Sequence, residues 1–280
     1  MTPSDRAQLA LLLEVAGEPK PGNVDRRRDV PGLRFEQFLA GAVGAREGLE
    51  LAESGPVGDA LETAVAGMAD ASGTNTQFGC LLLLTPLVRA ACASDGDLAR
   101  EDATAVVEAT TVDDAAAFYR AFEHADVAVR DPPEGVDDLD VRRGADAVPA
   151  VRERGLALSD VMELSADRDA NAREWVEGFP RVFRAAARVE AGDGPVADRA
   201  AEAFLALLAE APDTLVATQH GEAVAEEVRE RALDLQDADA DRVREFAADL
   251  VDRGVNPGTT ADLTAAALFV ALERGVTVRA

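Results

Sequence analysis

Residues 75–93 read Asn-Thr-Gln-Phe-Gly-Cys-Leu-Leu-Leu-Leu-Thr-Pro-Leu-Val-Arg-Ala-Ala-Cys-Ala. This stretch is apolar on nearly all sides, which predicts a central buried helix kinked at Pro86. Its longest apolar part, residues 80–93, contains Pro86 and Arg89 and is too short to span a bilayer. Cys80 and Cys92 lie in this apolar helical context, and we interpret both as core thiols.

Helical patterns occupy most of the chain on both sides of this stretch. The first covers residues 4–17, with Ser4 as the expected N-cap and Gly17 at its end. Further helices are predicted over residues 33–52, 57–71, 97–109, 111–125, 146–158, 167–190 with an interruption near Gly178 and Pro180, 195–211, 213–234, 239–253 and 258–274. Alanine is abundant and β-branched runs are short, which favours helix over strand. We expect an all-α, single-domain multi-helix bundle of about ten to twelve helices over residues 1–280, with the acidic stretch 130–144 as a surface excursion.

The composition is strongly acidic. Asp and Glu number 53 against 28 Lys and Arg, for a net charge of −25, yet 48 % of the residues are apolar, so the charge does not indicate disorder. Such a surface disfavours nucleic-acid binding. Together with the near absence of lysine, it predicts a cytoplasmic protein adapted to high salt, where charge repulsion is screened. No signal peptide and no membrane partner are expected.

Residues 18–25, Glu-Pro-Lys-Pro-Gly-Asn-Val-Asp, form a stretch that we call the proline loop. Its two prolines predict a stiff, irregular backbone. Lys20 is the only lysine in the chain. The loop could simply stop a helix, or it could present Lys20 to an anion, because a compact ammonium on a rigid backbone suits a phosphate oxygen.

Three other polar, glycine-bearing stretches stand at predicted helix boundaries. They are Ser72-Gly73-Thr74-Asn75-Thr76-Gln77-Phe78-Gly79, the segment 212–221 that begins Pro212-Asp213-Thr214, and Asn256-Pro257-Gly258-Thr259-Thr260-Ala261-Asp262-Leu263. Such residues can be ordinary helix caps, or they can present donors to a phosphate. Asp213 is equally consistent with an N-cap and with a magnesium ligand, and Asp262 with a first-turn carboxylate or a metal ligand.

A fifth polar stretch, residues 167–175, is interpreted mainly as a solvated helix with Asp169 and Arg173 paired at i,i+4. Trp175 gives a weaker indication of a nucleobase-stacking wall. No Walker loop, dinucleotide fingerprint, zinc spacing or nucleophile elbow is present in the sequence. The remaining carboxylates, amides and hydroxyls favour metal-assisted chemistry on a nucleotide.

Taken together, the four motifs resemble the triphosphoribosyl-dephospho-CoA synthase family over almost the whole chain. The resemblance is carried by Glu14, residues 19–25, Gly73–Thr76, Asp213-Thr214 and Asn256–Leu263. It implies an all-α fold and transfer of the triphosphoribosyl group of ATP to a hydroxyl of 3′-dephospho-CoA, with release of adenine. Bacterial members have His-Lys where this chain has Gln77-Phe78, and the sequence looks closer to an archaeal, haloarchaeal-like branch. The alternatives are a ribosyl or phosphoribosyl transferase with a different acceptor in another cofactor pathway, and a non-catalytic ATP-binding regulatory protein on the same fold.

The resemblance also implies roles for individual residues. Glu14, Lys20 and Asp25 are the expected catalytic residues. ATP and its phosphates are expected to contact Lys20, Gly73, Thr74, Asn75, Thr76, Asn256, Thr259 and Thr260. Mg²⁺ is the expected cofactor, and Asp25, Asp213 and Asp262 are the candidates for holding it or for acting as base on the acceptor hydroxyl.

Overall fold

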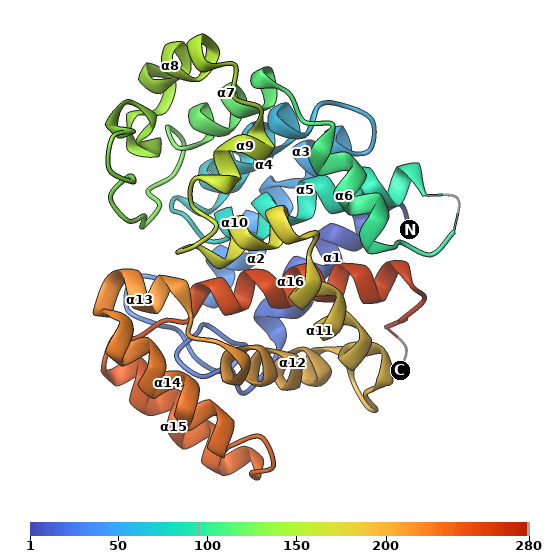
Figure 1. Cartoon of the computed structure of the whole chain (residues 1–280). Coiled ribbons are helices and arrows are strands. Elements are labelled where there is room, and N and C mark those ends of the chain that lie inside the picture. Colours follow the sequence, from blue (N-terminus) through green and yellow to red (C-terminus); the bar gives the residue numbers. More distant parts are fainter. Residues whose placement is uncertain (95, 279–280) are drawn as a thin grey trace.

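The computed structural model describes residues 1–94 and 96–278 and is built from helices throughout (Figure 1). Within these residues the helices are α1 (Pro3–Ala16), α2 (Phe35–Gly44), α3 (Arg46–Ala52), α4 (Val57–Ser72), α5 (Phe78–Ala93), α6 (Arg100–Glu108), α7 (Val112–Ala121), η1 (Asp137–Leu139), η2 (Val141–Ala147), α8 (Val148–Arg154), α9 (Leu158–Glu163), α10 (Ala170–Glu177), α11 (Pro180–Ala191), α12 (Val196–Glu210), α13 (Thr214–His220), α14 (Glu222–Asp234), α15 (Ala240–Asp252) and α16 (Gly258–Glu273). The η elements are 3₁₀ helices. The all-α prediction is confirmed.

The described residues contain sixteen α-helices, more than the ten to twelve predicted, because several expected helices are divided and α9 lies almost entirely where no helix was predicted. Residues 33–52 break at Ala45, which lets α2 and α3 both pack on α4. Residues 213–234 break at Gly221, whose φ of 90° suits glycine. The predicted break near Gly178 separates α10 from α11 as expected. The N-cap of α1 is Thr2 rather than Ser4, because Thr2 and Asp5 form a capping box.

Helix α5 is the buried element that its sequence predicted. It packs against α1, α3, α4, α6, α10 and α16. Pro86 lies inside it and has no N–H for the carbonyl of Leu82 one turn earlier. The indole Nε1 of Trp175 donates to that carbonyl at 3.1 Å and replaces the missing bond. Trp175 is therefore a core residue, and its interpretation as a nucleobase wall is wrong.

Cys80 is buried as predicted, but Cys92 is exposed, because it lies near the end of α5.

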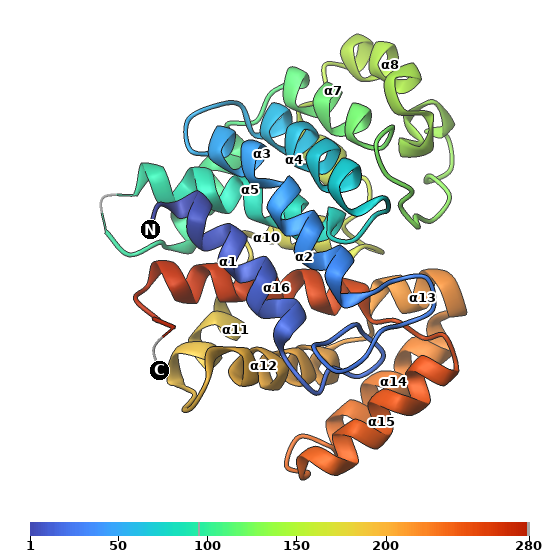
Figure 2. The ribbon, with the colours of Figure 1, turned by 180° about the vertical axis from the view of Figure 1, so that it is seen from behind.

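The second apolar helix, α16, crosses the middle of the molecule between α1 and α5 on one side and α11 and α12 on the other (Figures 1 and 2). Thirteen of its sixteen residues are buried, so its N-terminus is fixed against several neighbours. Helices α12 to α15 add a smaller apolar cluster, and the α14–α15 hairpin projects from the body. No helix in the described ranges is both long and apolar enough to cross a membrane.

Candidate functional site

One pocket of about 500 Å³ gathers residues from all four motifs. This volume lies in the usual range for small-molecule sites. The motif residues that line it include Glu14, Asn23, Thr74, Asn75, Thr76, Thr214, Asn256, Gly258, Thr259 and Asp262. They come from α1, the proline loop, the α4–α5 connection and the N-terminal ends of α13 and α16. The fold thus brings together polar segments that are far apart in the sequence.

Lys20 does not line this pocket. It is fully buried, and its Nζ lies 2.5 Å from Oε1 of Glu14 and 3.2 Å from Oδ1 of Asn23. Its ammonium also lies 5.8 Å from the ring centroid of Phe204. Because the ammonium is buried and paired with Glu14, Lys20 is not exposed to a phosphate in the pocket in this arrangement. Lys20 instead holds a carboxylate that does face the pocket.

The environment of Glu14 is set by two opposing effects. Burial raises the pKa of its carboxyl, and the charge and hydrogen bond of Lys20 oppose this rise. Beside this pair, Nδ2 of Asn23 donates to Oδ1 of Asn256 at 2.9 Å, which ties the proline loop to the start of α16. The proline loop therefore supplies the supports of the pocket rather than an exposed cation.

Asp25 also lies outside the pocket lining. Its Oδ1 accepts from the backbone N–H of Arg27 at 2.8 Å, and its backbone pairs with Arg28. Burial raises the pKa of Asp25, and the backbone N–H groups of Arg27 and Lys20 oppose the rise. These contacts make Asp25 part of the turn that closes the proline loop.

Asp213 is fully engaged by protein donors. Its Oδ1 accepts from the N–H groups of Leu215 and Val216 at 2.9 and 3.0 Å, and its Oδ2 accepts from the N–H and hydroxyl of Thr260, both at 2.7 Å. Asp213 is thus the N-cap of α13 and a clasp between α13 and α16. Neither Asp213 nor Thr260 lines the pocket, and Gly73, the left-handed C-cap of α4, does not line it either.

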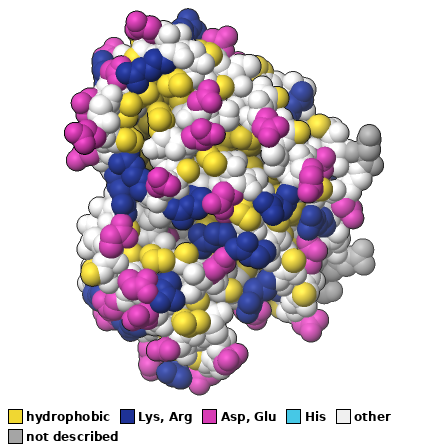
Figure 3. Space-filling view, viewed as in Figure 1, with side chains coloured by type: hydrophobic (Ala, Val, Ile, Leu, Met, Phe, Trp, Pro, Cys, Tyr) yellow, Lys and Arg dark blue, Asp and Glu magenta, His cyan; other side chains and the backbone are white. Residues whose placement is uncertain are grey.

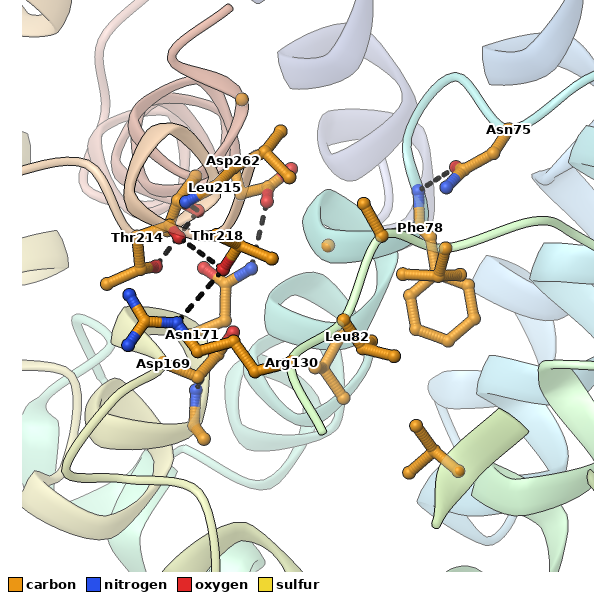
Figure 4. Close-up of a pocket in the computed structure, with 18 of the residues that line it drawn as sticks. Asn75, Phe78, Leu82, Arg130, Asp169, Asn171, Thr214, Leu215, Thr218 and Asp262 are labelled. Atoms are coloured by element: carbon orange, nitrogen blue, oxygen red, sulfur yellow. Dashed lines mark hydrogen bonds between the residues drawn. The ribbon is translucent and has the colours of Figure 1, made fainter. Parts of the chain in front are cut away.

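Asp262 is the carboxylate of the fourth motif that reaches the pocket (Figure 4). Its Oδ2 accepts from Nδ2 of Asn171 at 2.8 Å, and its Oδ1 accepts from the Cys80 thiol at 3.2 Å. Burial raises the pKa of Asp262 to about 7, although both hydrogen bonds lower it. A carboxyl group with this pKa can hold or release a proton near neutral pH.

Gly79 allows this arrangement to form. A Cβ atom at residue 79 would lie 2.0 Å from Oδ2 of Asp262 and 2.7 Å from Nδ2 of Asn171. Any larger side chain would therefore displace Asp262 or separate α5 from α10 and α16. The glycine after Gln77-Phe78 is required by close packing, a reason that the sequence did not reveal.

The other side of the pocket is apolar. Its lining includes Phe78, Leu82, Phe118, Phe122, Val161 and Met162. The ring of Phe78 lies 4.7 Å from that of Phe122, which in turn packs edge-on against Phe118 at 5.1 Å. Gln77 is buried beside Gly41. The Gln77-Phe78 pair thus supplies one aromatic ring to the pocket lining and no cation.

Residues 126–141, which we call the strap, cover the pocket from α7 to η2. Eleven of its sixteen residues line the pocket, so the interpretation of 130–144 as a surface excursion alone was incomplete. The strap is attached by polar contacts: Nδ2 of Asn75 donates to the carbonyl of Asp126 at 3.0 Å, and the Tyr119 hydroxyl donates to the carbonyl of Leu139 at 2.7 Å. Hydrophobic side chains gather toward the upper left of Figure 3, on the part of the molecule where α7, α8 and the strap lie in Figure 1.

Asn171 and Asp169 are site residues that were not identified as such from the sequence. Asn171 holds Asp262, and its Oδ1 is buried with no hydrogen-bond partner among the described residues. Asp169 lines the pocket and caps α10 by accepting from the N–H of Ala172 at 2.8 Å. The predicted pairing with Arg173 is wrong, because Arg173 donates to the carbonyls of Ala166 and Asp167. The polar run 167–175 was the available signal, but its helical spacing suggested a solvated face.

Comparisons with known proteins identify a family and a similar fold. The CitG family model, described as ATP:dephospho-CoA triphosphoribosyl transferase, matches residues 1–278. A crystal structure from Archaeoglobus fulgidus, provisionally described as a triphosphoribosyl-dephospho-CoA synthase, is similar with a TM-score of 0.69 and 28 % sequence identity, over 85 % of this chain and 98 % of that one. A search of curated proteins found no match.

Proposed function

The chain belongs to the ATP:dephospho-CoA triphosphoribosyl transferase family, and we propose that it carries out this transfer in the pocket described above. The enzyme moves the triphosphoribosyl group of ATP to a hydroxyl of 3′-dephospho-CoA and releases adenine. We assign the reaction to this pocket because Glu14 and Asp262, from opposite ends of the sequence, both line it.

The transfer exchanges one bond at C1′ of the ATP ribose for another. The acceptor oxygen bonds to C1′, and the bond from C1′ to adenine breaks with its electron pair going to adenine. The acceptor hydroxyl loses one proton and adenine gains one, so the reaction is balanced. By analogy with glycoside hydrolysis, the transition state has oxocarbenium character, which a nearby anionic carboxylate stabilises.

The two carboxylates have different surroundings, which suggests different roles. Burial raises the pKa of Glu14, but the Lys20 ammonium 2.5 Å away favours its ionised form, so we assign to Glu14 the stabilisation of positive charge at C1′. Asp262, with a pKa of about 7, is suited to one of the two proton transfers. Asn171 and Cys80 fix its orientation through their hydrogen bonds.

Magnesium is part of this proposal as the counter-ion of ATP. The described residues contain no group of three or more His, Cys, Asp or Glu side chains placed to hold a metal ion, and the oxygens of Asp213 are already occupied. A resident cage built from Asp25, Asp213 and Asp262 therefore does not fit this arrangement. We propose that Mg²⁺ enters bound to the triphosphate, as is usual for nucleotide substrates.

We place this reaction in a cytoplasm of high salt concentration. The net charge of −25 supports this, because like charges on the surface repel less strongly as salt screens them. Raising KCl from 0.1 M to 2 M should increase the melting temperature steeply, measured by circular dichroism. A protein that is most stable at low salt would contradict the halophilic assignment.

The decisive experiment measures free adenine after incubation with ATP, Mg²⁺ and 3′-dephospho-CoA at high KCl. Adenine and the triphosphoribosylated product should form in equal amounts, and Asp262→Asn should reduce the rate by about 10²–10⁴-fold. The matched control, Asp193→Asn, removes a carboxylate outside the pocket lining. If the wild-type protein binds ATP but releases no adenine, the proposed function is wrong.

A further inference from the structure

We propose that Arg130 and Arg168, and not Lys20, form the subsite that binds the triphosphate of ATP. This inference rests on the proposed function for the identity of the anion. Among the described residues that line the pocket, these two are the only cationic side chains. A triphosphate carries several negative charges and needs cations or N–H donors that it can reach.

Arg168 reaches the strap backbone directly beside Arg130. Nη1 of Arg168 donates to the carbonyl of Asp131 at 2.7 Å, directly after Arg130 in the chain. Nε of Arg130 donates to the Thr218 hydroxyl at 3.2 Å, which directs the guanidinium toward α13 and the polar end of the pocket (Figure 4). Thr218 and Thr214 line the pocket beside it.

Both guanidiniums can bind a phosphate with little loss of existing interactions. Nη2 of Arg130 donates to Glu222 at 2.7 Å, but the Glu222 side chain is 71 % exposed, so water screens this ion pair and a phosphate can replace it. The contact of Arg168 with a carbonyl uses one donor of a group that has five. The planar fork of each guanidinium matches two phosphate oxygens.

The neighbouring acidic side chains are mostly already engaged. Asp140 is bound by Arg142 through its two oxygens, at 2.9 and 2.8 Å from Nε. Asp169 accepts a hydrogen bond from the N–H of Ala172. Burial raises the pKa of Asp169, and this hydrogen bond and the charge of Arg130 oppose the rise. Because Asp169 would still repel a bare triphosphate, the magnesium complex is the suitable probe.

The test uses inorganic tripolyphosphate with Mg²⁺, measured by isothermal titration calorimetry at fixed KCl, because this probe needs no transfer chemistry. Arg130→Gln and Arg168→Gln should each weaken binding by about 10- to 100-fold, the loss expected for one charge-assisted contact. The control variant, Arg152→Gln, makes the same change in charge at an exposed ion pair outside the pocket and should bind like wild type. Circular dichroism should show equal folding for all four proteins.

Unchanged affinity in either pocket variant overturns the role of that arginine. Equal losses in the control variant, or no binding to the wild-type protein, overturn the subsite as a whole. These outcomes are independent of the adenine assay. An enzyme that releases adenine while both arginine variants bind tripolyphosphate normally would keep its function and lose this subsite.

Discussion

The proline loop and the strap border the same pocket but differ in almost every physical property. In the proline loop, every residue except Pro19 is buried, and its cation is enclosed against Glu14. In the strap, only Leu139 is buried, and its one cation, Arg130, lines the pocket. The rigid, buried segment is therefore suited to hold catalytic groups in position, whereas the exposed segment is suited to meet a charged ligand.

The difference shows why a conspicuous cation is a poor guide to a binding site. A charged group removed from water must be paired inside the protein, and such a pairing leaves it unavailable to a ligand. An arginine in a partly exposed segment loses little when it exchanges a screened partner for a phosphate. Burial, which the sequence does not show directly, decides between the two roles.

The largest loss of stability should come from breaking the buried ion pair between Lys20 of the proline loop and Glu14 of α1. Lys20→Met leaves Glu14 enclosed without its cation, which should lower the free energy of unfolding by about 3–5 kcal/mol. The double variant Glu14→Gln, Lys20→Met should recover much of this loss, because no buried charge remains. Urea unfolding followed by circular dichroism at fixed KCl measures both.

The Lys20→Met variant also tests directly whether the proline loop or the strap binds the phosphates. Under conditions in which Lys20→Met remains folded, its affinity for magnesium tripolyphosphate should equal that of wild type. A variant with normal stability and lost affinity would return Lys20 to the phosphate subsite and reverse the comparison.

A smaller loss of stability is expected from changing Glu18, which ties the proline loop to neighbouring arginines. Glu18 accepts from Nε of Arg244 at 2.7 Å and lies 3.7 and 3.6 Å from Arg26 and Arg27. The Arg244 hydrogen bond is the largest effect on the pKa of Glu18 and lowers it below the ordinary value of 4.5. Glu18→Gln should cost about 1–3 kcal/mol at neutral pH, since a buried acceptor loses its charge-assisted bonds.

The pH dependence of that loss has a definite sign. Because the pKa of Glu18 is lower in the folded state, its stabilisation is present above pH 4.5 and is lost as the pH falls through the folded-state pKa. The difference in unfolding free energy between wild type and Glu18→Gln should therefore shrink in acid. A difference that stays constant from neutral pH into acid would show that the charge of Glu18 is not the cause.

The smallest effect should come from the ion pairs that Arg142, the residue directly after the strap, makes with two strap carboxylates. Arg142 contacts Asp140 and Asp131, but half of its side chain is exposed. Exposed pairs of this kind contribute little to stability. Differential scanning calorimetry of Arg142→Gln should give an unchanged melting temperature. A fall as large as that of Glu18→Gln would show that the strap is held more firmly than its exposure indicates.

The sequence predicted much of the fold because the signals were local. The apolar run of α5 and the amphipathic periods of its neighbours follow from side-chain spacing alone. The predicted number of helices was too low because breaks such as that at Ala45 depend on how α2 and α3 pack against α4. Residues 126–141 have weak periodicity, so no local pattern indicated that they cover a pocket.

The sequence by itself determined the helical fold, the strong negative charge, the four polar motifs and the resemblance to a family, since each is written in residue types and their spacing. Tertiary structure decided which motif residues reach the pocket: Glu14 and Asp262 line it, whereas Lys20, Asp25 and Asp213 are engaged elsewhere. The physical reason is that a polar side chain becomes a site or a support according to its burial and its partners. Both depend on segments far away in the chain, as the contact of Asp262 with Asn171 and Cys80 illustrates.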